Sequence, residues 1–147
     1  MNIEEKINAD IKSAMLAKES KKLEALRAIK SVVLLLKTSP EEGLTEDSAM
    51  KAIQKEVKKR KESAEIYTSQ NRPDLVEAEL FQAEVMEAYL PKQLSEEEVK
   101  LELQKIIEQV GAKSATDMGK VMGVASKTLA GKADNKMVSV LVKQLLG

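Results

Sequence analysis

The chain has 147 residues, a length that fits one domain or two small packed units. It has 24 basic and 24 acidic side chains, so its net charge is zero and any basic binding surface must be local. It contains no cysteine and no histidine, which excludes disulfides, thiolate or imidazole metal sites and every catalytic dyad or triad that uses histidine, and we therefore expect no metal site and no cofactor.

The composition predicts an all-α protein. Hydrophobic residues make up 43% of the chain, which is enough for a packed core, but the aromatic residues are only two tyrosines and one phenylalanine. A core built on β-sheets normally uses more aromatic side chains than that. Alanine, leucine, lysine, glutamate and methionine dominate instead, and all of them favour helices.

Apolar residues at three- and four-residue spacing predict four long helices in the first part of the chain. The first follows Asn2, an N-cap whose capping-box partner is Glu5, and continues through Met15. The other three cover about residues 23–37, 45–71 and 74–90.

Three expectations concern how these helices pack. The second helix has a broad apolar patch at Val32–Leu36, so this helix should be covered on more than one side. The third helix would reach ~40 Å at about 1.5 Å per residue, so one of its ends should project or be held by its neighbour. The fourth helix has two adjacent apolar stripes, which indicates contact with two other helices.

Pro91 ends the fourth helix and marks a domain boundary. Beyond it the predicted helices are shorter and are bounded by cap residues: Ser95 with Glu98, Gly111, Gly131 and Asp134. They cover residues 96–110, about 117–130 and about 135–146. The predicted architecture is an up-and-down four-helix bundle in residues 1–90, a linker at 91–95 and a three-helix domain at 96–147.

Charge is uneven along the chain. Residues 51–61 hold six basic side chains and one acidic one, whereas residues 74–98 hold eight acidic side chains and one basic one. These two segments are expected to attract each other or to form solvated helix faces. Residues 111–147 hold six lysines and two acids, so the carboxyl-terminal part is the better basic surface.

Four lysines of that part are candidates for phosphate contact. Lys120 and Lys127 are one heptad apart and should share a helix side, and Lys113 and Lys132 flank the helix in loops where side chains and backbone N–H groups can reach a phosphate. A plain solvated surface is the alternative. Because aromatic residues are few, shape and phosphate recognition of folded RNA is favoured over stacking on single-stranded bases.

Two glycines on the same predicted helix, Gly119 and Gly123, stand four residues apart. Glycine in a helix interior is unfavourable by about 1 kcal/mol relative to alanine. We interpret the pair as a place where another backbone packs closely. They do not form a phosphate loop, because no Gly-Lys-Ser/Thr signature or preceding strand accompanies them.

The sequence contains no recognisable catalytic site. The sequence shows no paired catalytic set of recognisable spacing and no Gly-Ser-rich amidase stretch, so we expect no catalysis by the chain alone.

The first ten residues already include Glu4, Glu5 and Asp10, which is unlike a signal peptide, and no apolar run reaches the ~18 residues of a membrane span. These observations predict a cytoplasmic protein without a membrane partner.

Four strings of residues carry a family resemblance. They are KKRKESAEIYTSQNRPDLVEAE at 58–79, AYLPKQLSEEE at 88–98, DMGKVMG at 117–123 and GKAD at 131–134. In this order and spacing they resemble the GatB/YqeY family, specifically its stand-alone YqeY-like members. The resemblance covers essentially the whole chain.

The resemblance implies a four-helix bundle followed by a small three-helix domain, and a link to tRNA. The same module is similar to the tail of the GatB polypeptide of the tRNA-dependent amidotransferase, which amidates Glu-tRNA(Gln) or Asp-tRNA(Asn) with glutamine as nitrogen donor. In that enzyme the tail recognises tRNA and catalysis lies elsewhere. The family label, carbon–nitrogen ligase with glutamine as amido-N donor, is therefore expected to describe the parent complex, with tRNA or the amidotransferase machinery as partner of this chain.

Carried over residue by residue, the resemblance separates charged from structural positions. Its charged candidates for tRNA binding are Lys120, Lys132, Arg60 and Arg72, to which Lys113 and Lys127 are added by their location. Its structural positions are Pro91, Leu94, Gly119, Gly123, Gly131 and Asp134. A helical adapter that docks proteins without binding RNA is the alternative function.

Overall fold

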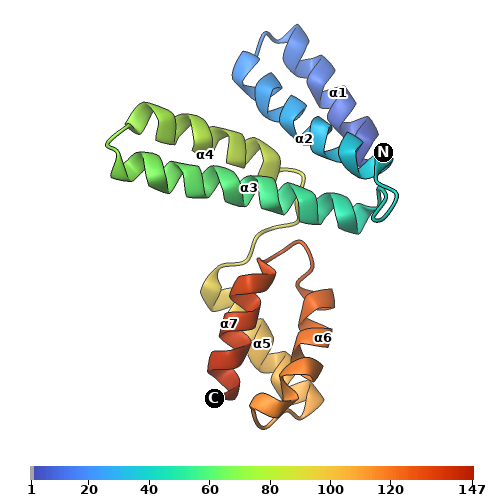
Figure 1. Ribbon diagram of the computed structural model, residues 1–147, viewed down its shortest axis with the longest axis vertical. Coiled ribbons are helices and arrows are strands. Elements are labelled where there is room, and N and C mark those ends of the chain that lie inside the picture. Colours follow the sequence, from blue (N-terminus) through green and yellow to red (C-terminus); the bar gives the residue numbers. More distant parts are fainter. Residues whose placement is uncertain (1) are drawn as a thin grey trace. The chain divides into compact units, whose positions relative to one another are not determined.

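The computed structural model describes residues 2–147, and across them the chain forms seven α-helices and one short 3-10 turn, with no β-strand (Figure 1). The all-α prediction is confirmed. The elements are α1 (Ile3–Leu16), α2 (Ser20–Thr38), α3 (Glu46–Ser69), α4 (Pro73–Glu87), α5 (Glu96–Val110), η1 (Ala115–Asp117), α6 (Met118–Thr128) and α7 (Asn135–Leu146).

Side-chain caps explain where several helices begin. The Asn2 side chain accepts from the Glu5 N–H at 2.8 Å, and Ser95 and Glu98 form the expected capping box at the start of α5. Asp134 caps α7 through the Lys136 N–H. These side chains satisfy N–H groups that have no partner inside the helix, so they stop each helix from extending backward.

Two helices end earlier than expected. α4 stops at Glu87, three residues before the predicted end, and α6 begins only after η1 and stops at Thr128. Between α3 and α4, Asn71 adopts a left-handed backbone with φ of 56°, and Pro73 occupies the first turn of α4. Asparagine tolerates that conformation and proline has a φ suited to a helix start, so this turn matches the sequence chemistry.

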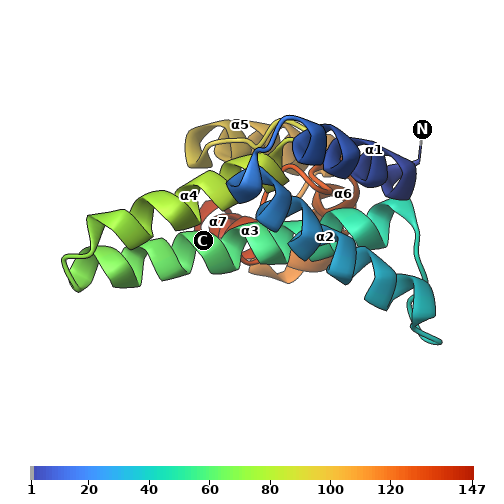
Figure 2. The same cartoon turned by 90° about the horizontal axis from the view of Figure 1, so that it is seen from above.

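The amino-terminal helices form two hairpins. α1 packs along α2, α3 packs along α4, and α2 contacts both α3 and α4 (Figures 1 and 2). The finer prediction of an up-and-down four-helix bundle is not confirmed by these pairings. The turn end of the α3–α4 hairpin extends past the part that α2 covers, as the length of the third predicted helix suggested.

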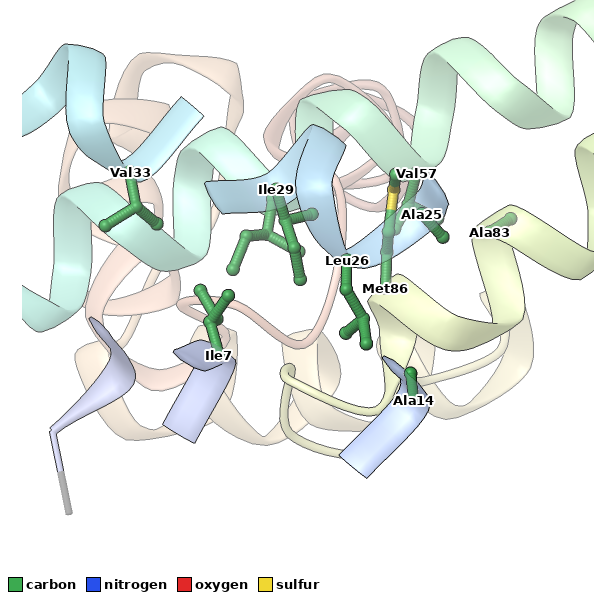
Figure 3. Packing of buried hydrophobic residues seen from close by; sticks show 10 residues of the cluster. Ile7, Ala14, Ala25, Leu26, Ile29, Val33, Val57, Ala83 and Met86 are labelled. Atoms are coloured by element: carbon green, nitrogen blue, oxygen red, sulfur yellow. The ribbon is translucent and has the colours of Figure 1, made fainter. Parts of the chain in front are cut away.

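The core of this unit lies where the hairpins meet. Ile7 from α1, Leu26 and Ile29 from α2, Ile53 from α3 and Met86 from α4 are at most 1% exposed. Figure 3 shows several of these side chains converging between the helices. Full burial of such a side chain stabilises the fold by about 1.5–3 kcal/mol.

The second helix, α2, contacts α1, α3 and α4, but its apolar patch Val32–Leu36 is covered only in part. Val33 and Leu36 are buried, but Leu34 is 42% exposed and Leu35 71%. α2 therefore buries a single stripe. The extra leucines widen its apolar surface without gaining a neighbour.

A polar contact ties α1 to the segment after α4. The Tyr89 hydroxyl donates a hydrogen bond to Asp10 Oδ2, and the Lys6 ammonium lies 4.9 Å from the centroid of the Tyr89 ring. Burial of the hydroxyl raises the pKa of Tyr89, and the hydrogen bond and the charge of Asp10 raise it further. The phenol thus stays protonated and donating throughout the physiological pH range.

The carboxyl-terminal unit has a core of its own. α5, α6 and α7 contact one another pairwise, and Val99, Leu103, Val121 and Val142 are fully buried among them. The chain separates into compact units after Pro91, and residues from Lys92 onward belong to the second unit. That the two units fold as independent domains stays a prediction, which separate expression of residues 2–91 and 92–147 would test.

We predict that Tyr89→Phe destabilises the amino-terminal unit by about 1 kcal/mol, because Asp10 loses its hydrogen-bond donor. Tyr67→Phe is the control, since the described residues offer its hydroxyl no hydrogen-bond partner, and we expect almost no change. Urea unfolding of both variants measures the difference. Equal stability of the two variants would show that the Tyr89–Asp10 contact does not stabilise this unit.

Candidate nucleic-acid interface

Helix α6 turns a basic face outward. Val121 and Ala125 are fully buried, which fixes the rotation of the helix against α5 and α7. Lys120 and Lys127 lie on the opposite side and are exposed. The shared side predicted for the two lysines follows from their seven-residue separation.

The interpretation of Gly119 and Gly123 as packing residues is wrong. A Cβ built on either glycine would meet nothing within 4 Å. The fold therefore gives no steric reason for glycine here, although each glycine lowers helix stability. They leave part of the α6 backbone uncovered beside the lysines.

A hydrogen-bonded clasp holds the turn that follows α6. The Gln93 side-chain amide donates to the Gly131 carbonyl at 2.6 Å, and the Leu94 N–H donates to the Lys132 carbonyl at 2.9 Å. Leu94 also packs against the core of this unit, and Gly131 is buried with a left-handed φ of 74°. We call these contacts the 93–132 clasp.

The clasp gives the signature residues a definite structural role. Pro91 and Leu94 were predicted to shape a linker, but Leu94 belongs to the second unit. Its backbone hydrogen bond to Lys132 connects the AYLPKQLSEEE segment with the GKAD segment. Gln93 was not singled out from the sequence. Its position inside the AYLPKQLSEEE string was the signal that could have identified it.

The backbone N–H groups beside the lysines are already used. The Lys113 N–H donates to Asp117 Oδ2 at 2.9 Å, and the Lys132 N–H donates to the Leu129 carbonyl at 3.0 Å. The Lys113 N–H is the main cause that lowers the pKa of Asp117, with smaller contributions from Ser114, Lys120 and the Lys113 charge. These two N–H groups already have acceptors, so Lys113 and Lys132 offer a phosphate their exposed ammonium groups.

The four lysine side chains form no salt bridge among the described residues. Within residues 2–147, no carboxylate lies within 4.0 Å of the ammonium of Lys113, Lys120, Lys127 or Lys132. Lys120, Lys127 and Lys132 are exposed. A lysine without a salt bridge gives up no existing ion pair when it binds a phosphate.

The two arginine candidates are placed differently. Arg60 pairs with Glu56 and donates from Nε to Gln82 Oε1 at 3.3 Å, and only 19% of its side chain is exposed. Arg72 forms a bidentate pair with Asp74: its Nε donates to Oδ1 at 3.2 Å and its Nη2 donates to Oδ2 at 3.1 Å. These contacts favour structural roles, so the lysines of the second unit are the stronger candidates.

The basic segment of α3 is partly neutralised, as one interpretation of its charge anticipated. Lys61 Nζ lies 2.5 Å from Glu87 Oε1 of α4, and Lys51 Nζ lies 3.1 Å from Asp47 Oδ2 of its own helix. Both pairs reduce the charge that α3 offers to a polyanion, and the exposed Lys51–Asp47 pair contributes little stability.

Metal and membrane-spanning features do not occur in the described part of the chain. Over residues 2–147, no group of three or more acidic side chains is arranged to hold a metal ion. No helix in the same range combines the length and apolar character needed to cross a bilayer.

These features define a class: an all-helical protein of two units whose second unit exposes lysines without salt bridges. The family model for Yqey-like protein matches residues 4–146, and the chain belongs to that family.

Curated relatives agree with this assignment. A protein of Pyrenophora tritici-repentis named altered inheritance of mitochondria protein 41, mitochondrial, is 29% identical over 97% of this chain and 80% of its own length. Proteins of the same name from Clavispora lusitaniae and Meyerozyma guilliermondii are each 30% identical over 84% of this chain, which corresponds to 74% and 66% of their own lengths.

The prediction of a cytoplasmic location is contradicted by these relatives, whose names all say mitochondrial. The prediction had rested on excluding a signal peptide and a membrane span. Neither exclusion distinguishes the cytoplasm from the interior of an organelle, so the argument could not support the location it named.

We predict that Gly123→Ala raises the free energy of unfolding of the carboxyl-terminal unit by about 0.5–1 kcal/mol. The position is helical, the added methyl group meets open space, and alanine loses less backbone entropy on folding. Gly111→Ala is the contrasting variant, because Gly111 has a φ of 67° and alanine would be strained there. Destabilisation by Gly123→Ala in thermal unfolding would show that the glycine has a packing role after all.

Proposed function

We propose that this chain is a tRNA-associated accessory module that binds tRNA through its carboxyl-terminal unit and does not catalyse a reaction alone. The observation that carries the proposal is the set of lysines without salt bridges around the outer face of α6: Lys113, Lys120, Lys127 and Lys132.

Simple electrostatics supports RNA as the ligand. Each lysine that neutralises a phosphate releases a counterion, so local positive charge gives affinity even when the whole chain is neutral. The uncovered backbone at Gly119 and Gly123 would let a phosphate–ribose chain approach α6 more closely than a helix with side chains there. Recognition would then depend on RNA shape and phosphate positions more than on bases.

The family resemblance supports tRNA in particular. The GatB tail, which this module resembles, recognises tRNA in an enzyme whose chemistry occurs in another domain. This chain has no histidine and no cysteine, so the amide-transfer label is proposed to belong to a partner complex. The names of the three relatives lead us to propose a mitochondrial setting.

A helical adapter that docks proteins is the competing function. The exposed apolar side chains of α4, Leu80 and Phe81, favour it. The salt dependence of the binding affinity distinguishes RNA binding from protein docking. RNA binding weakens steeply as salt is added, whereas docking through apolar faces does not.

We predict that the double variant Lys120→Glu, Lys132→Glu lowers tRNA affinity at least about 10-fold at low salt, equivalent to about 1.4 kcal/mol. Each change replaces an attraction with a repulsion, and the dependence of affinity on salt should flatten. Filter binding over a salt series measures both quantities. Circular dichroism should show intact helices, because both side chains are exposed.

The matched control is Lys18→Glu with Lys21→Glu, which changes the net charge equally at two exposed positions of the amino-terminal unit. It should retain most of the affinity. Equal losses in both double variants would mean that only total charge matters. Absence of tRNA binding by the unmodified protein at low salt would favour the adapter.

A further inference from the structure

The turn end of the α3–α4 hairpin carries a groove. A cavity of about 360 Å³ opens there, with Val76 and Leu80 of α4 forming apolar lining and Glu77 and Arg72 at polar positions. This volume exceeds that of any single side chain. The lining residues of the groove belong to positions 68–80, the turn end of the α3–α4 hairpin, and Figure 1 shows that this end of the hairpin extends past α2.

Large apolar side chains stay uncovered beside this groove. Leu80 is 46% exposed, and its neighbour Phe81, the chain's single phenylalanine, is 38% exposed. Farther along α4, Ala83 and Met86 are buried against the core. α4 therefore buries Ala83 and Met86 and leaves Leu80 and Phe81 as uncovered apolar surface, with Leu80 also lining the groove.

The charge of α4 indicates which partner fits. Residues 73–87 contain five acidic side chains and no basic one. Asp74 pairs with Arg72 and Glu87 with Lys61, but among the described residues no cation lies within 4.0 Å of the carboxylates of Glu77, Glu79 or Glu84. Arg72 and Glu77 both line the groove, but the adjoining outer side of α4 carries the exposed Glu77 and Glu84 without a paired cation in residues 2–147, so this side of the helix is negative and attracts a basic partner.

The spacing of the exposed residues suits a helix as partner. Glu77, Phe81 and Glu84 stand four and three residues apart and therefore share the outer side of α4. An amphipathic helix presents apolar anchors and flanking charges at the same intervals.

We infer that this groove, with the adjoining outer side of α4, docks a basic amphipathic helix of another protein. An apolar anchor of that helix enters between Val76 and Leu80, and its lysines or arginines face Glu77 and Glu84. This surface lies in the amino-terminal unit and goes beyond the proposed tRNA binding, which uses lysines of the other unit.

The test uses the intact chain and two fluorescein-labelled helical peptides of about 15 residues. One carries leucines at three- and four-residue spacing flanked by lysines, and the other has glutamate in place of each lysine. Fluorescence anisotropy should show at least about 10-fold tighter binding of the basic peptide. Added salt should narrow that difference.

Variants then locate the site. Glu77→Lys and Leu80→Ala should each weaken binding of the basic peptide about 10-fold. The matched controls are Glu62→Lys, at an exposed position of α3, and Leu35→Ala, at a leucine of α2 that is 71% exposed, and both should bind as the unmodified protein does. The variant Lys120→Glu, Lys132→Glu should also bind the peptide normally, so failure of tRNA binding and failure of docking are distinguishable.

Equal affinity for the two peptides, or equal losses in the site and control variants, would overturn the inference. If a site variant fails to fold, amide chemical-shift mapping of the unmodified protein with the basic peptide decides the question. Shifts confined to residues 68–84 support the groove, and shifts elsewhere contradict it. Sedimentation without peptide should show no self-association through this surface, and dimers that Leu80→Ala abolishes would identify a second copy as the occupant instead.

Discussion

The 93–132 clasp is the contact on which the candidate interface depends. It joins residues 38 positions apart, Gln93 and Gly131, and Gly131 is the buried, left-handed residue of the turn between α6 and α7. Because Leu94 enters the same core as Val121 and Ala125, the clasp and the packing of α6 stabilise each other. With this turn in place, Lys120 and Lys127 are directed outward and Lys132 keeps an exposed side chain.

The neutral net charge of the chain hides two local surfaces of opposite sign. The carboxyl-terminal unit exposes lysines without salt bridges, and α4 of the amino-terminal unit exposes carboxylates beside apolar side chains. A polyanion is attracted to the first and repelled by the second, whereas a basic helix has the reverse preference. An accessory protein that connects RNA with a protein partner would need such a division, and the family assignment is compatible with it.

The helices were predictable because local chemistry determines them. α5 and α7 match their predicted bounds, since Ser95, Glu98, Gly111 and Asp134 act on neighbours in sequence. Long-range features were not predictable. Periodicity shows that a helix has an apolar side but not whether a neighbour exists to cover it, which is why the exposure of Leu34 and Leu35 and the open surroundings of Gly123 differ from expectation. The excess of lysines in the carboxyl-terminal unit was visible from local charge, but the internal hydrogen bonds of the Lys113 and Lys132 N–H groups depend on how the loops fold and could not be predicted.

We propose that tRNA contacts the outer face of α6 and the turn held by the clasp. Amide chemical-shift mapping of the intact chain during titration with tRNA would locate this contact residue by residue. We expect the largest changes at low salt at Gly119, Lys120, Gly123 and Lys132, and we expect residues 74–87 of α4 to stay unchanged. Changes concentrated on α3 or α4, or a spectrum that tRNA leaves unaltered, would contradict it.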